Sequence, residues 1–161
     1  MSRTVRDSAL LLQVLSGHDP RDPGSLREHV DDYLGAVERD VRGLRLAWSP
    51  DFGYAPVEEE VVEAAGRAAR AFEDLGCSVE SSDLTLDPPF EAFWTLFSSV
   101  SLARNPTVLE AHADELTSYG RECYERAAAA TSVEYAQALG RVDRLKDQFA
   151  DLFDVYGLLL T

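Results

Sequence analysis

The sequence predicts an α/β fold that combines one βαβ unit, a possible third short strand and a helical half. Three observations support this prediction. Residues 44–84 contain an apolar run, an amphipathic segment and a second apolar run. Residues 90–156 repeat apolar side chains at helical spacing, and residues 158–160 form a last apolar run. We expect the chain to divide into a helix plus βαβ unit at 1–86, a helical lobe at 87–156 and a terminal strand at 157–161.

The first element is predicted to be a helix that starts after Thr4 and ends before Gly17. Thr4 followed by Asp7 is a variant of the capping box, and glycine is a common helix terminator. Five large aliphatic side chains cover most of the helix circumference, which predicts burial on several sides. These are Leu10, Leu11, Leu12, Val14 and Leu15.

Residues 18–25 carry the turn signals of a loop, and residues 31–41 predict a short element before the first strand. Several side chains in this region could be interpreted as a metal site, but they lack any fixed ligand spacing. They are His18, Asp19, Asp22, His29, Asp31 and Asp32. We interpret them as solvated turn and surface residues, and we expect neither a metal nor another cofactor.

The βαβ unit begins with a strand at 44–48, which Ser49-Pro50 ends. Pro56 is predicted to open a helix that Gly76 ends, and residues 79–84 follow as a second, parallel strand. The turn after the first strand lacks the glycine pattern of a nucleotide-binding loop. One helix face is predicted to contain Val61, Ala65, Ala68, Phe72 and Leu75.

The helical half opens with an aromatic stripe, in which Phe90, Phe93, Phe97 and Val100 recur at helical spacing beside Trp94. Such a stripe usually belongs to a core. The alternative is that Phe93, Trp94 and Phe97 line a substrate pocket, because ligand pockets also have mostly apolar walls.

Three further helices are predicted: one from Asn105-Pro106 to Leu116, one at 117–130 with Gly120 interrupting, and a long last one. Thr131 and Glu134 form a capping box for that last helix. Its apolar face is predicted to contain Tyr135, Leu139, Val142, Leu145, Phe149, Leu152 and Tyr156.

Composition excludes several classes of partner. The net charge of −14, from 29 acidic and 15 basic residues, repels nucleic acid and anionic membrane surfaces. Neither an apolar run of transmembrane length nor a signal-peptide core is present, so we expect a soluble, cytoplasmic protein. Cys77 and Cys123 are too far apart for a zinc knuckle and are interpreted as packing residues.

No catalytic constellation is found in the sequence. None of the serines lies in a G-x-S-x-G or S-x-x-K pattern. Lys146 lies on the polar side of an amphipathic helix, where a solvated lysine keeps its proton and is a poor base. We therefore predict no catalytic residue in this chain.

Spaced segments nevertheless resemble the amidase signature family over nearly the whole chain. The N-terminal segments look like the family's "G-P-M-x-R-T-V-x-D-A-A-L-L-L-x-V-L-x-G-x-D-x-x-D-P". Residues 43–48 resemble the strand that follows this segment in the family, and residues 72–80 resemble its "L-x-x-L-G-x-x-V-x-E" stretch. Residues 156–161 resemble its "Y-D-x-L-L-T-P" strand, with Gly157 where aspartate is usual. The segments are MSRTVRDSALLL (1–12), VLSG (14–17), DPRDP (19–23), GLRLAW (43–48), FEDLGCSVE (72–80) and YGLLLT (156–161).

This resemblance implies a fold, an activity and a missing site. The family hydrolyses amide bonds through a Ser-cisSer-Lys triad, and all three residues precede the segment that Met1 matches. The resemblance therefore implies a single incomplete amidase-like domain at 1–161, inactive in isolation, whose helical lobe helps to shape the substrate funnel. A buried strand at residue 160 also predicts that the natural chain continues.

Two alternatives remain open: a non-enzymatic protein-interaction module, and the accessory half of a split amidase. The module would bind a protein through its helical half, and the accessory half would be active only with a partner that carries the triad. For the amidase fragment itself, the expected partner is the missing catalytic segment or a second copy of the chain. Binding would use exposed apolar surface on the helix at Leu10–Leu15 and on the strand edges.

Overall fold

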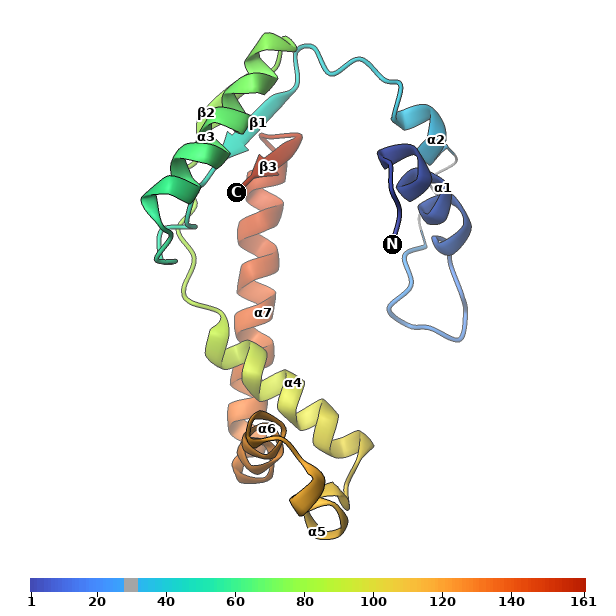
Figure 1. Cartoon of the computed structure of the whole chain (residues 1–161), viewed down its shortest axis with the longest axis vertical. Coiled ribbons are helices and arrows are strands. Elements are labelled where there is room, and N and C mark those ends of the chain that lie inside the picture. The colour runs from blue at the N-terminus through green and yellow to red at the C-terminus, as the bar shows by residue number, and fades with distance from the viewer. Residues whose placement is uncertain (28–31) are drawn as a thin grey trace. The chain divides into compact units, whose positions relative to one another are not determined.

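A computed structural model describes residues 1–27 and 32–161, and these form two compact units (Figure 1). Unit 1 is Met1–Arg42 and unit 2 is Gly43–Thr161. The sequence-based boundaries at residues 86 and 156 stay predictions. His29 and Asp31, which were considered as metal ligands, lie outside the described residues.

Unit 1 contains helix α1 (Val5–Leu15) and the short helix α2 (Tyr33–Ala36). Thr4 caps α1 as predicted, because its Oγ1 accepts a hydrogen bond from the backbone N–H of Asp7 at 3.1 Å. Gly17 follows the helix with a φ of 138°, which glycine adopts without steric cost. The short element predicted at 31–41 is α2, although its predicted first residue is not described.

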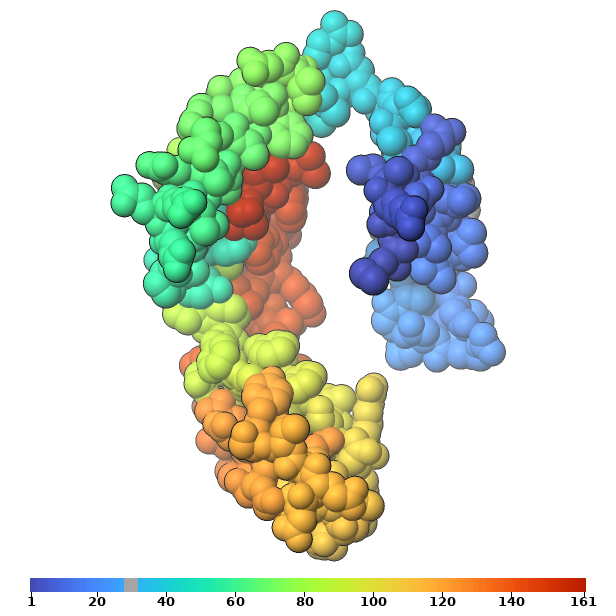
Figure 2. All heavy atoms as spheres, in the orientation of Figure 1, coloured from blue at the N-terminus to red at the C-terminus, as the bar shows by residue number. Residues whose placement is uncertain are grey.

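The predicted burial of α1 is wrong for this chain. Ala9 is the one buried residue of the helix. All five large aliphatic side chains are exposed. Figure 2 shows the N-terminal residues, in dark blue, at the surface of unit 1. The physical reason is that α1 meets the rest of its unit through polar side chains, so that its apolar side faces water.

The three strands of unit 2 form one parallel sheet in the order β2-β1-β3. They are β1 (Arg45–Trp48), β2 (Ser78–Ser81) and β3 (Leu158–Leu160). Leu46 lies opposite Val79 on one side and Leu158 on the other. Leu46 and Ala47 are 0% exposed, so β1 is the centre of the core. The predicted βαβ unit and third strand are confirmed.

Helix α3 (Glu59–Asp74) links β1 to β2 but begins three residues after Pro56, where the sequence placed its start. Glu58 is still extended and acts as the N-cap, and its carbonyl accepts the first helical hydrogen bonds. The second strand also differs, since it ends at Ser81 and not at residue 84. Ser82 Oγ accepts a hydrogen bond from Leu84 N at 3.1 Å, which turns the chain out of the sheet.

The covered face of α3 is only partly the predicted one. Val61, Ala68 and Leu75 are exposed, whereas Ala65 and Phe72 are half-buried. The buried residues are Gly66 and Ala69, and a Cβ on Gly66 would lie 3.9 Å from Trp48 Cζ2. The helix approaches the sheet through its smallest residues. The spacing of large apolar residues therefore does not predict which face is buried.

The helical part of unit 2 lies between β2 and β3 in sequence (Figure 1). The helix predicted from 105 to 116 is broken at His112, whose backbone leaves the helical conformation. The elements of this helical part are α4 (Phe90–Arg104), α5 (Val108–Ala111), the 3₁₀ turn η1 (Ala113–Glu115), α6 (Ser118–Ala129) and α7 (Ser132–Phe153).

The last two helices start where the sequence predicted. Thr131 Oγ1 accepts from Glu134 N at 3.2 Å, and Glu134 Oε2 accepts from Thr131 N at 2.8 Å, which confirms the capping box. Gly120 does not interrupt α6, because its N–H bonds to Thr117 Oγ1 in the first turn. The predicted apolar stripe is at least half-buried except at Leu139, and its last member, Tyr156, lies beyond the end of α7 at Phe153. No helix in residues 1–27 and 32–161 has the length and hydropathy needed to cross a bilayer.

Candidate functional site

Helix α4 separates small buried residues from exposed aromatic ones. Ala92 and Ser98 are its buried residues, and the helix packs against α6 and α7. Small side chains there let the helices approach closely. The aromatic stripe therefore does not form the core: four of its members, Phe90, Phe93, Phe97 and Val100, are exposed.

The aromatic rings of α4 form one continuous cluster around Trp94. Phe93 and Phe97 stack with centroids 5.5 Å apart and an interplanar angle of 12°. The Trp94 ring makes T-shaped contacts with both, and its centroid lies 5.6 Å from that of Phe93 and 5.9 Å from that of Phe97. It also contacts Phe90 at 5.8 Å and Tyr119 of α6 at 5.4 Å. Mutual contact fixes the rings even though they are in contact with water.

Phe93 and Phe97 border an apolar hollow of about 540 Å³ between α4 and α7. Its one charged side chain is Arg104, the last residue of α4. A hollow of this size and chemistry suits the apolar part of a small molecule. The lining residues are Pro89, Ala92, Phe93, Leu96, Phe97, Val100, Ser101, Arg104, Val142 and Leu145.

Trp94 instead borders a smaller hollow of about 230 Å³ with Phe90, Tyr119, Glu122, Cys123 and Arg126. Desolvation, and then the interaction with Cys123, raise the pKa of Tyr119 above its usual range. Arg126 donates from Nη1 to Glu91 Oε2 at 3.1 Å and is thus already paired.

The three sequence-predicted pocket residues therefore touch each other but do not share one hollow. Phe93 and Phe97 border the larger hollow and Trp94 the smaller one. Sequence reasoning missed Arg104 as a charged lining residue and Tyr119 as the partner of Trp94. Val142 and Leu145 were identifiable as apolar members of the α7 stripe, but not as the opposite wall.

In the described residues no serine is hydrogen-bonded to Lys146, the one lysine of the sequence. Lys146 is exposed and donates to Asp143 at 3.3 Å, as expected for a solvated lysine. Ser98 Oγ is fully buried without a hydrogen-bond partner in the described part of the chain, so it lacks both a base and access to substrate. Over residues 1–27 and 32–161 there is no group of three carboxylate, imidazole or thiol side chains that could hold a metal ion.

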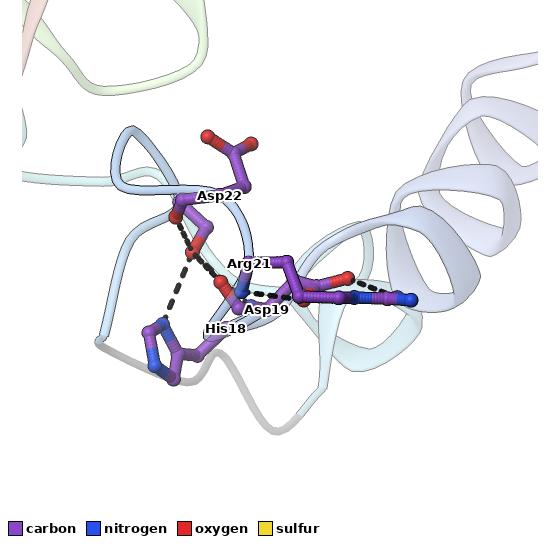
Figure 3. Close-up of polar contacts among 5 residues, drawn as sticks. His18, Asp19, Arg21 and Asp22 are labelled. Carbon is purple, nitrogen blue, oxygen red and sulfur yellow. Dashed lines mark hydrogen bonds and ion pairs between the residues drawn. The ribbon is translucent and has the colours of Figure 1, made fainter.

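The loop after α1 brings a histidine and a serine together without forming a catalytic pair (Figure 3). His18 Nδ1 lies 3.0 Å from Ser25 Oγ. That hydroxyl also bonds to the carbonyl of Asp22 at 2.8 Å, which uses it to close the turn. A hydrogen-bonded ion pair with Arg21 lowers the pKa of Asp19. All these contacts stabilise the loop, in agreement with its interpretation as a solvated turn.

Comparison with known proteins assigns the fold to a family. A family model for amidases matches residues 1–156. The chain belongs to the amidase family. An acylamidase from Rhodococcus erythropolis is 31% identical to it over 158 residues, which are 97% of this chain and 32% of that protein. A glutamyl-tRNA(Gln) amidotransferase subunit from Rubrobacter xylanophilus is 49% identical over 80 residues, or 49% of this chain and 17% of that protein.

A solved structure supports the same assignment. A bacterial aryl acylamidase of the amidase signature family superposes with a TM-score of 0.86 at 26% identity. The match covers 96% of this chain and 34% of that amidase. The amidase resemblance and the α/β fold predicted from the sequence are confirmed, and the chain spans about a third of the length of either acylamidase.

Proposed function

We propose that this chain is the substrate-shaping part of an amide hydrolase and is inactive without a segment that carries the Ser-cisSer-Lys triad. The observation that carries the proposal is the amidase family match over residues 1–156. Within the described residues Lys146 pairs with Asp143 and not with a serine, which is consistent with it.

We further propose that the larger hollow receives the apolar part of the substrate. The stacked rings of Phe93 and Phe97 offer an apolar wall, and Trp94 fixes both rings. An aryl or acyl amide fits this chemistry, and two relatives are named for such substrates. We also propose a cytoplasmic location, which the acidic composition of the chain favours.

Hydrolysis of an acylated nitroaniline, followed by absorbance, tests the first proposal. The purified chain alone should release no nitroaniline above the buffer rate. Addition of the remaining part of an acylamidase should restore turnover. Turnover by the chain alone that disappears when one of its serines is replaced would contradict the proposal.

The pocket proposal has its own test in the reconstituted enzyme. Phe93→Ala should raise KM for aryl amides several-fold while leaving KM for a short acyl amide nearly unchanged. Phe90→Ala is a matched control, since Phe90 lies on the same helix, is similarly exposed and borders the other hollow. Equal effects of the two substitutions would argue against a specific role for the larger hollow.

An alternative function is a protein-interaction module without enzymatic activity. The exposed aliphatic side chains of α1 favour it, because large exposed apolar patches mark contact surfaces. This alternative requires a binding partner unrelated to amidases, and hydrolysis restored by an amidase segment would exclude it.

A further inference from the structure

Helix α1 presents its polar side to its own unit. Between Ala9 and Leu15 the one polar side chain is Gln13, and its Oε1 accepts a hydrogen bond from Tyr33 N at 2.8 Å. Nearer the start of the helix, Arg6 donates to Glu38 Oε1 at 2.9 Å. These polar contacts attach α1 to the segment around α2, whereas soluble helices normally pack through their apolar side.

The opposite side is an apolar arc, which we define as Val5, Leu10, Leu11, Leu12, Val14 and Leu15. At about 100° per residue these positions spread over roughly 220° of the helix circumference. Their exposed fractions range from 47% at Leu11 to 78% at Leu15. A helix that is apolar over most of its circumference is characteristic of a position inside a larger protein.

The width of the apolar arc restricts what can cover it. A second copy of the chain would meet α1 through one two-fold interface and would leave much of the arc in water. A partner that surrounds the helix is required. The aryl acylamidase offers such a partner, because the match with this chain takes up only 34% of that protein.

We propose that the apolar arc of α1 binds the remaining part of an amidase domain, which folds around the helix and carries the catalytic triad. This inference rests on the proposed function. It holds whether that part belongs to the same polypeptide or to a separate one. Asp7 is the one charged side chain within the angular span of the arc, and none lies between Ala9 and Leu15, so the contact is mainly apolar and should weaken little as salt concentration increases.

The binding experiment uses the full 161-residue chain and a tagged polypeptide containing the part of the Rhodococcus erythropolis acylamidase outside the match. Three forms of the chain are compared by pull-down and titration: wild type, the Leu10→Glu/Leu15→Glu double variant, and Leu75→Glu. Leu75 is a matched control, since it is 56% exposed, close to the 52% of Leu10, but lies at the end of α3. Circular dichroism confirms that each variant keeps its helix content.

We expect wild type and Leu75→Glu to bind with similar affinity and the double variant to bind at least tenfold more weakly. Hydrogen exchange of the wild-type chain provides a second readout that needs no substitution. The amides of α1 should become protected in the complex, while those of α6 should change little.

Three results would overturn the inference: no complex with the wild-type chain, affinity of the double variant within twofold of wild type, or protection that excludes α1. Homodimers lost in the double variant would identify a second copy as the occupant and would equally overturn it. Binding through α1 without amide hydrolysis would leave the inference intact and contradict the proposed function. If the double variant supports hydrolysis as well as wild type does, the proposed function would stand and the inference about α1 would be contradicted.

Discussion

Strand β1 and helix α1 have similar apolar sequences and opposite environments. Leu46 and Ala47 are fully buried between the neighbouring strands and the helices of unit 2. Leu11 and Leu15 of α1 are exposed, although their helix is at least as apolar. Hydrophobicity indicates that a segment needs to be covered, but it does not identify the chain that covers it. Strand β1 is covered by other parts of this chain, whereas the apolar side of α1 is not covered by any described part of it.

The largest effect is expected from truncating the same residue type in the two environments. Leu46→Ala should lower the free energy of unfolding by about 2–5 kcal/mol, because it opens a cavity in the core. Leu11→Ala should change it by about 0.5 kcal/mol or less, because its side chain is already in contact with water. Urea denaturation of both variants measures the difference, and similar losses would show that α1 is covered within the chain.

A second substitution tests the backbone next to β1. Gly53 has a φ of 73°, and a Cβ there would lie 2.8 Å from Thr85 Cγ2. Gly53→Ala should cost about 2 kcal/mol from the unfavourable backbone conformation and the steric contact. Gly157→Ala is the control, since its Cβ would meet Leu44 and Arg45 at ordinary distances of 3.7 and 3.8 Å. Thermal unfolding should rank the two, and an equal shift in Tm would refute the steric argument.

The third prediction concerns a buried polar group in the helical part. Ser98→Ala should raise the free energy of unfolding by about 1 kcal/mol, because it removes a buried hydroxyl without a partner in the described residues. Ser101→Ala should have little effect, since Ser101 Oγ donates to Phe97 O at 2.8 Å in a partly exposed position. Destabilisation by Ser98→Ala in chemical denaturation would show that the hydroxyl has a partner.

The smallest effect is a pH dependence at the edge of the sheet. Arg45 donates to both carboxylate oxygens of Glu80, which lowers the pKa of Glu80, and the ring of Tyr156 lies 5.0 Å from the guanidinium carbon. A lowered pKa in the folded state stabilises the fold above the unfolded value of about 4.3, and this contribution is lost as pH falls through the folded value.

Glu80→Gln tests this ion pair. The variant should be less stable than wild type at neutral pH, and the two should converge in strong acid. Urea denaturation between pH 7 and pH 2 follows the difference. A gap that stays constant over this range would assign the effect to packing, not to charge.

The sequence predicted those features that depend on local or repeated signals. The parallel strands around Leu46 follow from short apolar runs separated by a helix, and the capping box at Thr131 follows from local hydrogen bonding. The covered face of α3 could not be predicted, because close packing there uses Gly66 and Ala69, which contribute little to an apolar pattern.

The candidate site was only partly predictable for a related reason. Phe93, Trp94 and Phe97 were identified from their spacing, yet their division between two hollows depends on where α6 and α7 pack. Arg104 carried no signal in the sequence, since its position in the larger hollow results from the path of α4. That the chain holds no catalytic residue stays a prediction, which rests on the absent serine motifs and on the amidase resemblance.

The most direct test of the proposed function is the rate of nitroaniline release by this chain with and without the remaining part of an acylamidase. We predict the buffer rate for the chain alone and turnover only after the catalytic segment is added. Turnover by the chain alone, abolished by replacing one of its own serines, would contradict the proposed function.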